Sequence, residues 1–99
     1  MTVAVEAAQS MLGLDVYVSG HCFGCPEARR LAGVIAERFE SVTVRVVDLD
    51  AEPEARPERV IAVPVYVLDG KLVSFGNPRQ RDLIKEIELA LAAGKAISW

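Results

Sequence analysis

The chain has 99 residues, 52% of them hydrophobic, and a formal net charge of −3, which suits one domain with a core of its own. The mild acidic balance, with charges of both signs interspersed, excludes the basic face of a nucleic-acid binder and the polybasic patch of a membrane-surface protein. No run approaches the ~20 apolar residues that cross a bilayer, and the first residues lack the charged start of a signal peptide. We therefore expect a cytoplasmic protein that contacts neither nucleic acid nor membrane.

The first predicted elements follow a short N-terminal extension, residues 1–12, whose structure the pattern leaves open. A β-branched, alternating run from Leu14 to Val18 predicts the first strand. From Cys25 to Phe39, apolar side chains recur at spacings of three and four, which predicts an amphipathic helix.

Residues 41–49 predict the second strand, in which valines alternate with other residues as far as Val46 and Val47. Because that pair makes both faces apolar, we expect this strand in the middle of a sheet covered on both sides. The following segment is acidic and broken by Pro53 and Pro57, so at most one or two helical turns are expected there.

Residues 60–68 predict the third strand, in which Pro64 marks either the start of the strand or a cis peptide bond. Asp69-Gly70 is a dipeptide strongly favoured in two-residue hairpin turns. Residues 71–75 are therefore expected as a fourth strand, antiparallel to the third.

Asn77 as cap and Pro78 at the first helical position predict the start of the last helix, and Gly94 predicts its end. These elements place one domain over residues 13–93. A tail over residues 94–99, with the lone Trp99, is left unassigned.

Both cysteines lie in His21-Cys22-Phe23-Gly24-Cys25-Pro26, between the first strand and the first helix. Two intervening residues let both sulfurs meet once the backbone turns into a helix. We expect Cys22 at the cap, where unpaired N–H groups and the helix dipole favour a thiolate, and Cys25 about one turn inside. Cys22 is then the nucleophile that attacks a disulfide, and Cys25 resolves the mixed disulfide.

The residues around the cysteines leave alternatives open. A protonated His21 would stabilise the Cys22 thiolate, or His21 is a solvated loop residue. Phe23 is expected to be exposed and to line a substrate groove, whereas Tyr66 is expected in the core. The cysteine pair itself is either redox-active, or redox-silent on an interaction module, or a carrier of metal or persulfide. A structural zinc ion needs four ligands, and only His21 stands near the two thiols in the sequence. We therefore expect no metal site within one chain, and no other cofactor.

The order of these features resembles the thioredoxin/glutaredoxin superfamily over about residues 13–93. The resemblance rests on three matches: Cys22-Phe23-Gly24-Cys25 at the strand-to-helix junction, Ala62-Val63-Pro64 at the third strand, and Asp69-Gly70-Lys71 followed by Gly76. A proline directly after the second cysteine is similar to small glutaredoxin-like proteins. The resemblance implies an α/β, thioredoxin-like fold: a four-stranded mixed sheet flanked by helices on both faces.

The resemblance also implies a thiol–disulfide oxidoreductase that acts on protein or low-molecular-weight disulfides and takes electrons from a reductase or glutathione. Pro64 looks like the cis-proline of the family, so Pro64, Val63 and Phe23 would bind an extended substrate. The sequence departs from the family at several places. His21 and Phe23-Gly24 stand where thioredoxins have a tryptophan and Gly-Pro. Val16 stands where thioredoxins carry a buried acid, and Gly76-Asn77 differs from the Gly-Gly with which glutaredoxins hold glutathione.

Overall fold

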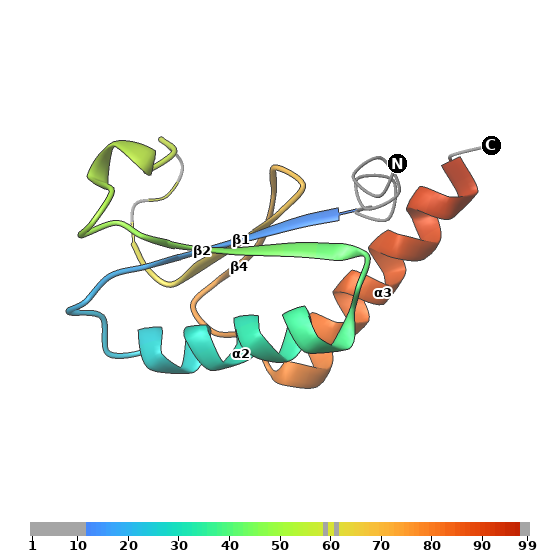
Figure 1. The fold of residues 1–99 in the computed structure, drawn as a ribbon, viewed down its shortest axis with the longest axis horizontal. Helices are drawn as coiled ribbons and strands as arrows, with labels where there is room; N and C mark the ends of the chain where they lie inside the picture. The colour runs from blue at the N-terminus through green and yellow to red at the C-terminus, as the bar shows by residue number, and fades with distance from the viewer. Residues whose placement is uncertain (1–11, 59, 61, 98–99) are drawn as a thin grey trace, which may run out of the picture.

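The computed structural model describes residues 12–58, 60 and 62–97, so most of the predicted N-terminal extension and Trp99 lie outside the described residues. In chain order the elements are β1 (Leu12–Val18), α2 (Cys25–Arg38), β2 (Val42–Asp48), the 3₁₀ turn η1 (Pro53–Ala55), β3 (Val65–Leu68), β4 (Lys71–Phe75) and α3 (Gln80–Ile97) (Figure 1). The strands form one sheet in the order β2-β1-β3-β4, parallel between β1 and β2 and antiparallel elsewhere. The predicted four-stranded mixed sheet is confirmed.

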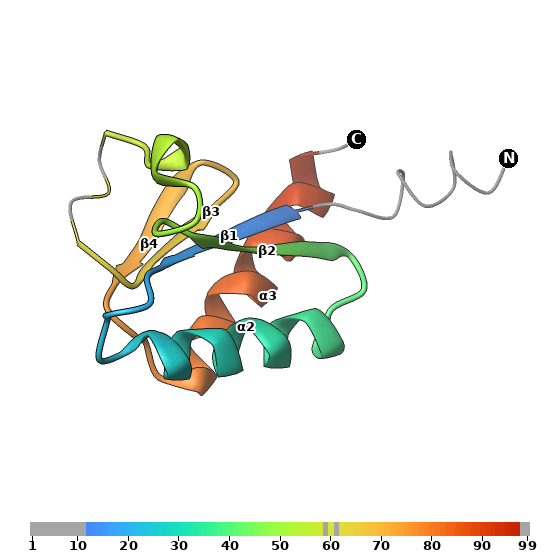
Figure 2. The same cartoon turned by 60° about the vertical axis from the view of Figure 1, so that its left-hand side comes forward.

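Both α-helices of the described residues lie on the same face of the sheet (Figures 1 and 2). Alternate residues of β1, namely Leu14, Val16 and Val18, face that side because side chains alternate along a strand. They pack in one cluster with fully buried residues of the helices: Ala28, Leu31, Ile35, Leu83 and Ile87. This apolar layer fixes α2, and with it the cysteine pair, against the sheet.

The opposite face of the sheet is covered by the segment between β2 and β3, which contains η1 (Figure 2). Its buried cluster consists of Tyr17, Val47, Leu49, Val60, Val65 and Val67. The predicted α/β, thioredoxin-like fold class is therefore confirmed. In the described part of the chain, however, α-helices do not flank both faces of the sheet, because this face carries a 3₁₀ turn, within the one or two helical turns expected for this segment. Pro57 accounts for the lack of a longer helix, since a helix that continued past Ala55 would need the backbone N–H that a proline lacks, whereas Pro53 at the first position of the turn needs no such N–H.

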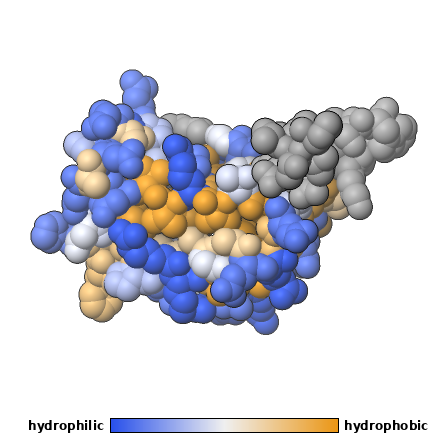
Figure 3. All heavy atoms as spheres, viewed as in Figure 1, coloured by the Kyte–Doolittle hydropathy of each residue, from blue (hydrophilic) through white to orange (hydrophobic). Residues whose placement is uncertain are grey.

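The prediction that the second strand lies in the middle of the sheet is wrong. β2 is an edge strand, paired with β1 from Leu12–Val42 to Val18–Asp48, and Val46 is 37% exposed. The inner positions belong to β1 and β3, and every residue of β3 is buried. A band of hydrophobic residues crosses the face of the molecule at the level of β2 (Figure 3). Two adjacent valines thus indicated an apolar strand but not its place in the sheet.

The β3–β4 hairpin has the turn that its sequence predicts. Asp69 and Gly70 both have positive φ, 50° and 80°, which is the combination of a type I′ turn. The Asp69 carboxylate also accepts a 2.7 Å hydrogen bond from the Gly13 N–H of β1. β3 itself begins at Val65, later than predicted, because Pro64 has no N–H to offer a ladder.

The last helix departs from its predicted limits at both ends. It begins at Gln80, so Asn77 is not its N-cap, and the Asn77 side chain is engaged elsewhere. The helix continues through Gly94 to Ile97, into the stretch that was expected to be a tail. A glycine costs a helix only about 1 kcal/mol relative to alanine. None of the helices in the described ranges has the length and hydropathy to span a bilayer.

Candidate active site

The two cysteines form a disulfide at the start of α2, with their Cα atoms 5.2 Å apart, inside the usual range for disulfides. α2 begins at Cys25, Gly24 is its N-cap, and Pro26 lies in its first turn. The prediction that Cys22 caps the helix is therefore wrong. Cys22 lies in the preceding turn, and its carbonyl accepts a 3.2 Å hydrogen bond from the Cys25 N–H. This turn brings the Cys22 sulfur back to the first residue of the helix.

The two sulfur-bearing residues differ in exposure. Cys25 is 1% exposed and belongs to the core beneath α2. Cys22 is half-buried and packs at the margin of the same cluster. Cys22 is thus the more exposed of the two cysteines, and the order of attack expected from the sequence stays a prediction.

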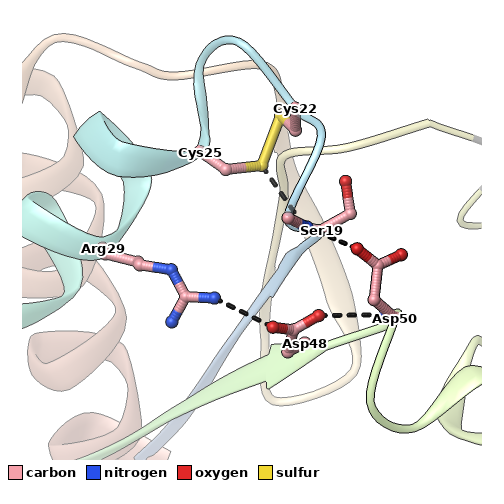
Figure 4. A network of polar contacts seen from close by, with 7 residues as sticks. Ser19, Cys22, Cys25, Arg29, Asp48 and Asp50 are labelled. Carbon is pink, nitrogen blue, oxygen red and sulfur yellow. Dashed lines mark hydrogen bonds and ion pairs between the residues drawn. A yellow bond between two sulfur atoms is a disulfide. The ribbon is translucent and has the colours of Figure 1, made fainter.

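The Cys25 sulfur faces a backbone donor: the Ser19 N–H lies 3.5 Å from Cys25 Sγ (Figure 4). A hydrogen bond to a sulfur favours its negatively charged form. Val16 is completely buried in the cluster that contains Cys25, and no Asp or Glu side chain is buried in residues 12–58, 60 and 62–93. Within that part of the chain, the Cys25 sulfur is thus faced by the backbone N–H of Ser19, and no buried carboxyl group accompanies it.

The loop that carries the cysteines is tied to the end of β2 by polar contacts (Figure 4). The Gly20 N–H donates to the Asp50 carboxylate at 2.6 Å, and the Asp50 N–H donates to the Asp48 carboxylate at 2.9 Å. Arg29 of α2 pairs with the same Asp48 at 3.2 Å. A Cβ at Gly20 would lie 3.0 Å from Asp50 Oδ2, so glycine permits this approach. The network joins the loop to β2 and α2.

Val63 and Pro64 lie against the cysteine loop, as predicted. The Val63–Pro64 peptide bond is cis. The Val63 carbonyl oxygen is 3.4 Å from Cys22 Sγ; in the disulfide that sulfur carries no hydrogen, whereas the reduced thiol can donate to this oxygen. Pro64 is buried, and its Cδ lies 3.7 Å from the position of a Cβ built on Gly24.

Two predicted site residues lie on the surface of the cysteine turn. Phe23, between the cysteines, is 103% exposed, so its ring contributes no burial to the fold. The His21 side chain is exposed as well. Their parts in substrate binding and in tuning the thiolate stay predictions.

Asn77 is a site residue that sequence reasoning missed. Its Oδ1 accepts a 2.7 Å hydrogen bond from the Tyr66 hydroxyl, and its Nδ2 donates a 2.8 Å hydrogen bond to the Gly24 carbonyl. Burial raises the pKa of Tyr66 above its ordinary value, so the hydroxyl keeps the proton that it donates. An Asn-Pro dipeptide indicates a helix cap, and nothing local signals a contact across 53 residues of sequence.

In the described ranges, no three or more His, Cys, Asp or Glu side chains are grouped so as to hold a metal ion. His21 and the two cysteines lie in one short turn, and the cysteines are joined to each other. The site as it stands is a disulfide at a helix start.

A comparison of the whole chain with known families matches the thioredoxin domain over residues 12–88. That range includes Cys22, Cys25 and Pro64. The chain therefore belongs to the thioredoxin family, and its CxxC pair, at disulfide distance, supports thiol–disulfide exchange as the chemistry of the site in general.

Particular relatives agree with this family. A thioredoxin from Methanocaldococcus jannaschii is 26% identical over 84 residues, which make up 83% of this chain and 99% of that protein. A solved thioredoxin variant from Halobacterium salinarum is 24% identical, with a TM-score of 0.65 over 87% of this chain and 80% of that one. An N-terminal domain structure of alkylhydroperoxide reductase AhpF from Enterococcus faecalis is 24% identical with a TM-score of 0.66, and the match covers 84% of this chain but 42% of that chain. At these identities the solved structures show a shared fold.

Proposed function

We propose that this protein is a thiol–disulfide oxidoreductase that uses Cys22 and Cys25 on protein or low-molecular-weight disulfides. The observation that carries the proposal is the unequal exposure of two cysteines joined at a helix start. The half-buried Cys22 can meet a substrate, and Cys25, 1% exposed, lies within reach of Cys22 and away from solvent.

The exchange takes place in two displacements. The Cys22 thiolate bonds to one sulfur of the substrate disulfide, and the other substrate sulfur leaves as a thiolate. The Cys25 thiolate then bonds to Cys22 Sγ, and the remaining substrate sulfur leaves in turn. The substrate gains two electrons and the cysteine pair loses two. The proton of Cys25 passes to an outgoing substrate thiolate or to water, since no Asp or Glu is buried among residues 12–58, 60 and 62–93.

The electrostatics of the turn support the nucleophile. Cys22 lies beside the N-terminus of α2, whose unpaired N–H groups and dipole favour negative charge. Such positions lower a thiol pKa from about 8.5. His21 adds to this effect in its protonated form, and its place next to Cys22 supports that assignment.

The substrate would lie across the cysteine turn and the Val63–Pro64 peptide. The Val63 carbonyl, 3.4 Å from Cys22 Sγ, suits an extended peptide that pairs with backbone groups while its sulfur reaches Cys22. Phe23, fully exposed beside the disulfide, offers that peptide an apolar contact. Electrons would return to the pair from a reductase or from glutathione. Two cysteines close together in the sequence that exchange between dithiol and disulfide suit a cytoplasmic location.

The test is redox equilibration of the purified protein in graded glutathione or dithiothreitol buffers, followed by alkylation and mass spectrometry. A reversible two-electron step in the range of cellular thiol couples is expected. Cys22→Ser should abolish the mixed disulfide with a substrate, and Cys25→Ser should trap it; the reverse pattern would overturn the roles. A pair that no buffer opens would leave a redox-silent module, and metal analysis of the same sample tests the carrier alternative.

A further inference from the structure

Asn77 lies where three segments of the site meet. Its side chain joins the buried Tyr66 of β3 to Gly24, the N-cap of α2. A Cβ built on Gly24 would lie 3.1 Å from Asn77 Nδ2 and 3.7 Å from Pro64 Cδ. The cysteine turn is thus in close contact with both Asn77 and the proline of the substrate site at Gly24.

The orientation of the Asn77 amide follows from its partners. A carbonyl can only accept, so Nδ2 must face the Gly24 oxygen, and Oδ1 then faces the Tyr66 hydroxyl. Tyr66 lies on an inner strand and is completely buried in the core cluster between the sheet and the helices, which gives Asn77 a rigid anchor in the core. The Gly24 carbonyl also accepts the first hydrogen bond of α2, from the Ala28 N–H at 3.2 Å. Asn77 therefore holds the atom from which the helix begins.

This contact matters most when the disulfide is open. In the oxidised protein a covalent bond holds Cys22 next to Cys25, and the Asn77 contact adds little to that constraint. In the mixed disulfide, only non-covalent contacts keep Cys25 Sγ close to Cys22 Sγ. The rate of resolution and the stability of the closed disulfide both depend on that proximity.

We propose that Asn77 is a positioning residue that holds the cysteine turn in the geometry in which Cys25 reaches Cys22, with Tyr66 as its anchor. This inference rests on the proposed redox function. Loss of the contact lowers the effective concentration of Cys25 at Cys22, so it weakens the disulfide relative to the dithiol and lengthens the life of the mixed disulfide.

The experiment compares Asn77→Ala with the unchanged protein in the same glutathione series, and follows resolution of a mixed disulfide by rapid mixing and alkylation. We expect the equilibrium constant for disulfide formation to fall about threefold to tenfold, tenfold being about 30 mV for this two-electron couple. The resolution rate should fall by a similar factor. Tyr66→Phe removes only the anchor and should shift both quantities in the same direction by less.

Two further variants separate positioning from a general loss of stability. Ser74→Ala removes the 2.8 Å hydrogen bond from Ser74 Oγ to the Gly76 carbonyl, in the same connection but away from the cysteine turn, and should leave both readouts within about twofold of the unchanged protein. Asn77→Asp keeps the acceptor for Tyr66 but loses the donor to Gly24, so it should reproduce the effect of Asn77→Ala even if the alanine variant does not fold.

The outcomes are distinguishable. If folded Asn77→Ala and Asn77→Asp both match the unchanged protein in equilibrium constant and resolution rate, the positioning role is overturned. If Ser74→Ala shifts them as much as Asn77→Ala does, the effect belongs to general destabilisation and the inference also fails. If the unchanged protein shows no reversible step at all, the proposed function itself fails.

Discussion

The oxidised protein should resist unfolding more than the reduced protein does. The cysteines are separated by 3 positions, so the disulfide closes a loop of about four residues. In the chain-entropy treatment, closing such a loop lowers the conformational entropy of the unfolded ensemble by about 6 cal/mol/K. At 25 °C this stabilises the folded state by about 1.9 kcal/mol. This is the stabilisation expected if the folded protein accommodates the disulfide and the dithiol equally well.

The interaction of a thiolate with the start of α2 opposes this stabilisation of the oxidised protein. In the reduced protein the helix N-terminus stabilises the Cys22 thiolate by about 0.3–1 kcal/mol, which favours the dithiol. The net stabilisation of the oxidised form is therefore about 1–1.6 kcal/mol. With an unfolding entropy of about 2.1 cal/mol/K per residue, the melting temperature should rise by about 5–8 °C on oxidation.

The assay is urea and thermal unfolding followed by circular dichroism, with and without excess dithiothreitol. Cys25→Ser is the matched control, because its unfolding should not respond to the reductant. If the reduced protein proves as stable as the oxidised one, the reasoning fails; if it proves more stable, folding favours the dithiol and makes the pair more oxidising than the same cysteines in the unfolded chain. The expected sign makes the pair about 20–35 mV more reducing than the same cysteines in the unfolded chain.

Three other predictions follow from burial. Ile87→Ala should destabilise the fold by about 2–5 kcal/mol in urea unfolding, because Ile87 is fully buried, whereas Leu89→Ala on the same helix, at a position 58% exposed, should cost less than about 1 kcal/mol. Phe23→Ala should leave stability within about 0.5 kcal/mol and slow the reduction of a protein disulfide more than that of a small one; equal slowing would remove Phe23 from the substrate site. Since burial raises the pKa of Tyr66 above its unfolded value of 10.0, the stability that it contributes is complete below about pH 10 and is lost as the pH rises further. Phenolate absorbance of Tyr66 should appear only with unfolding, and Tyr66→Phe should lose less stability between about pH 10 and pH 11.

Local patterns predicted much of the fold because they act over a few residues. Alternation along β1 identified a strand. Asp69-Gly70 identified the turn of the β3–β4 hairpin, because this pair favours the backbone conformation that the turn requires. The position of β2 at the edge escaped prediction, since strand order depends on pairing between distant segments. The cysteine pair was recognisable from its spacing, and the helix was correctly predicted to start at Cys25, but its cap was assigned to Cys22 whereas the structure has Gly24 there.

Asn77 shows most clearly why part of the site could not be predicted. In the sequence, Asn77 precedes a proline, and that dipeptide is an ordinary helix start. In the fold, both hydrogen-bonding groups of its side chain are used by residues far away along the chain, Tyr66 and Gly24. The helix then begins later, at Gln80. The contact depends on the tertiary structure and has no signature in local sequence.

The surroundings of Cys25 decide how the second displacement can work. The apolar side chain of Val16 stands where thioredoxins carry a buried acid. Burial of Cys25 among apolar side chains disfavours its thiolate form. The Ser19 N–H, 3.5 Å from the sulfur, acts in the opposite sense. Asp50 accepts a backbone hydrogen bond from Gly20 of the loop, and Asp48 accepts one from the Asp50 N–H and pairs with Arg29, so both carboxylates are engaged with donors other than Cys25. Under the proposed function, the fixed dipole of an N–H and the proximity that the turn enforces therefore activate Cys25, and its proton is lost to the outgoing thiolate or to water.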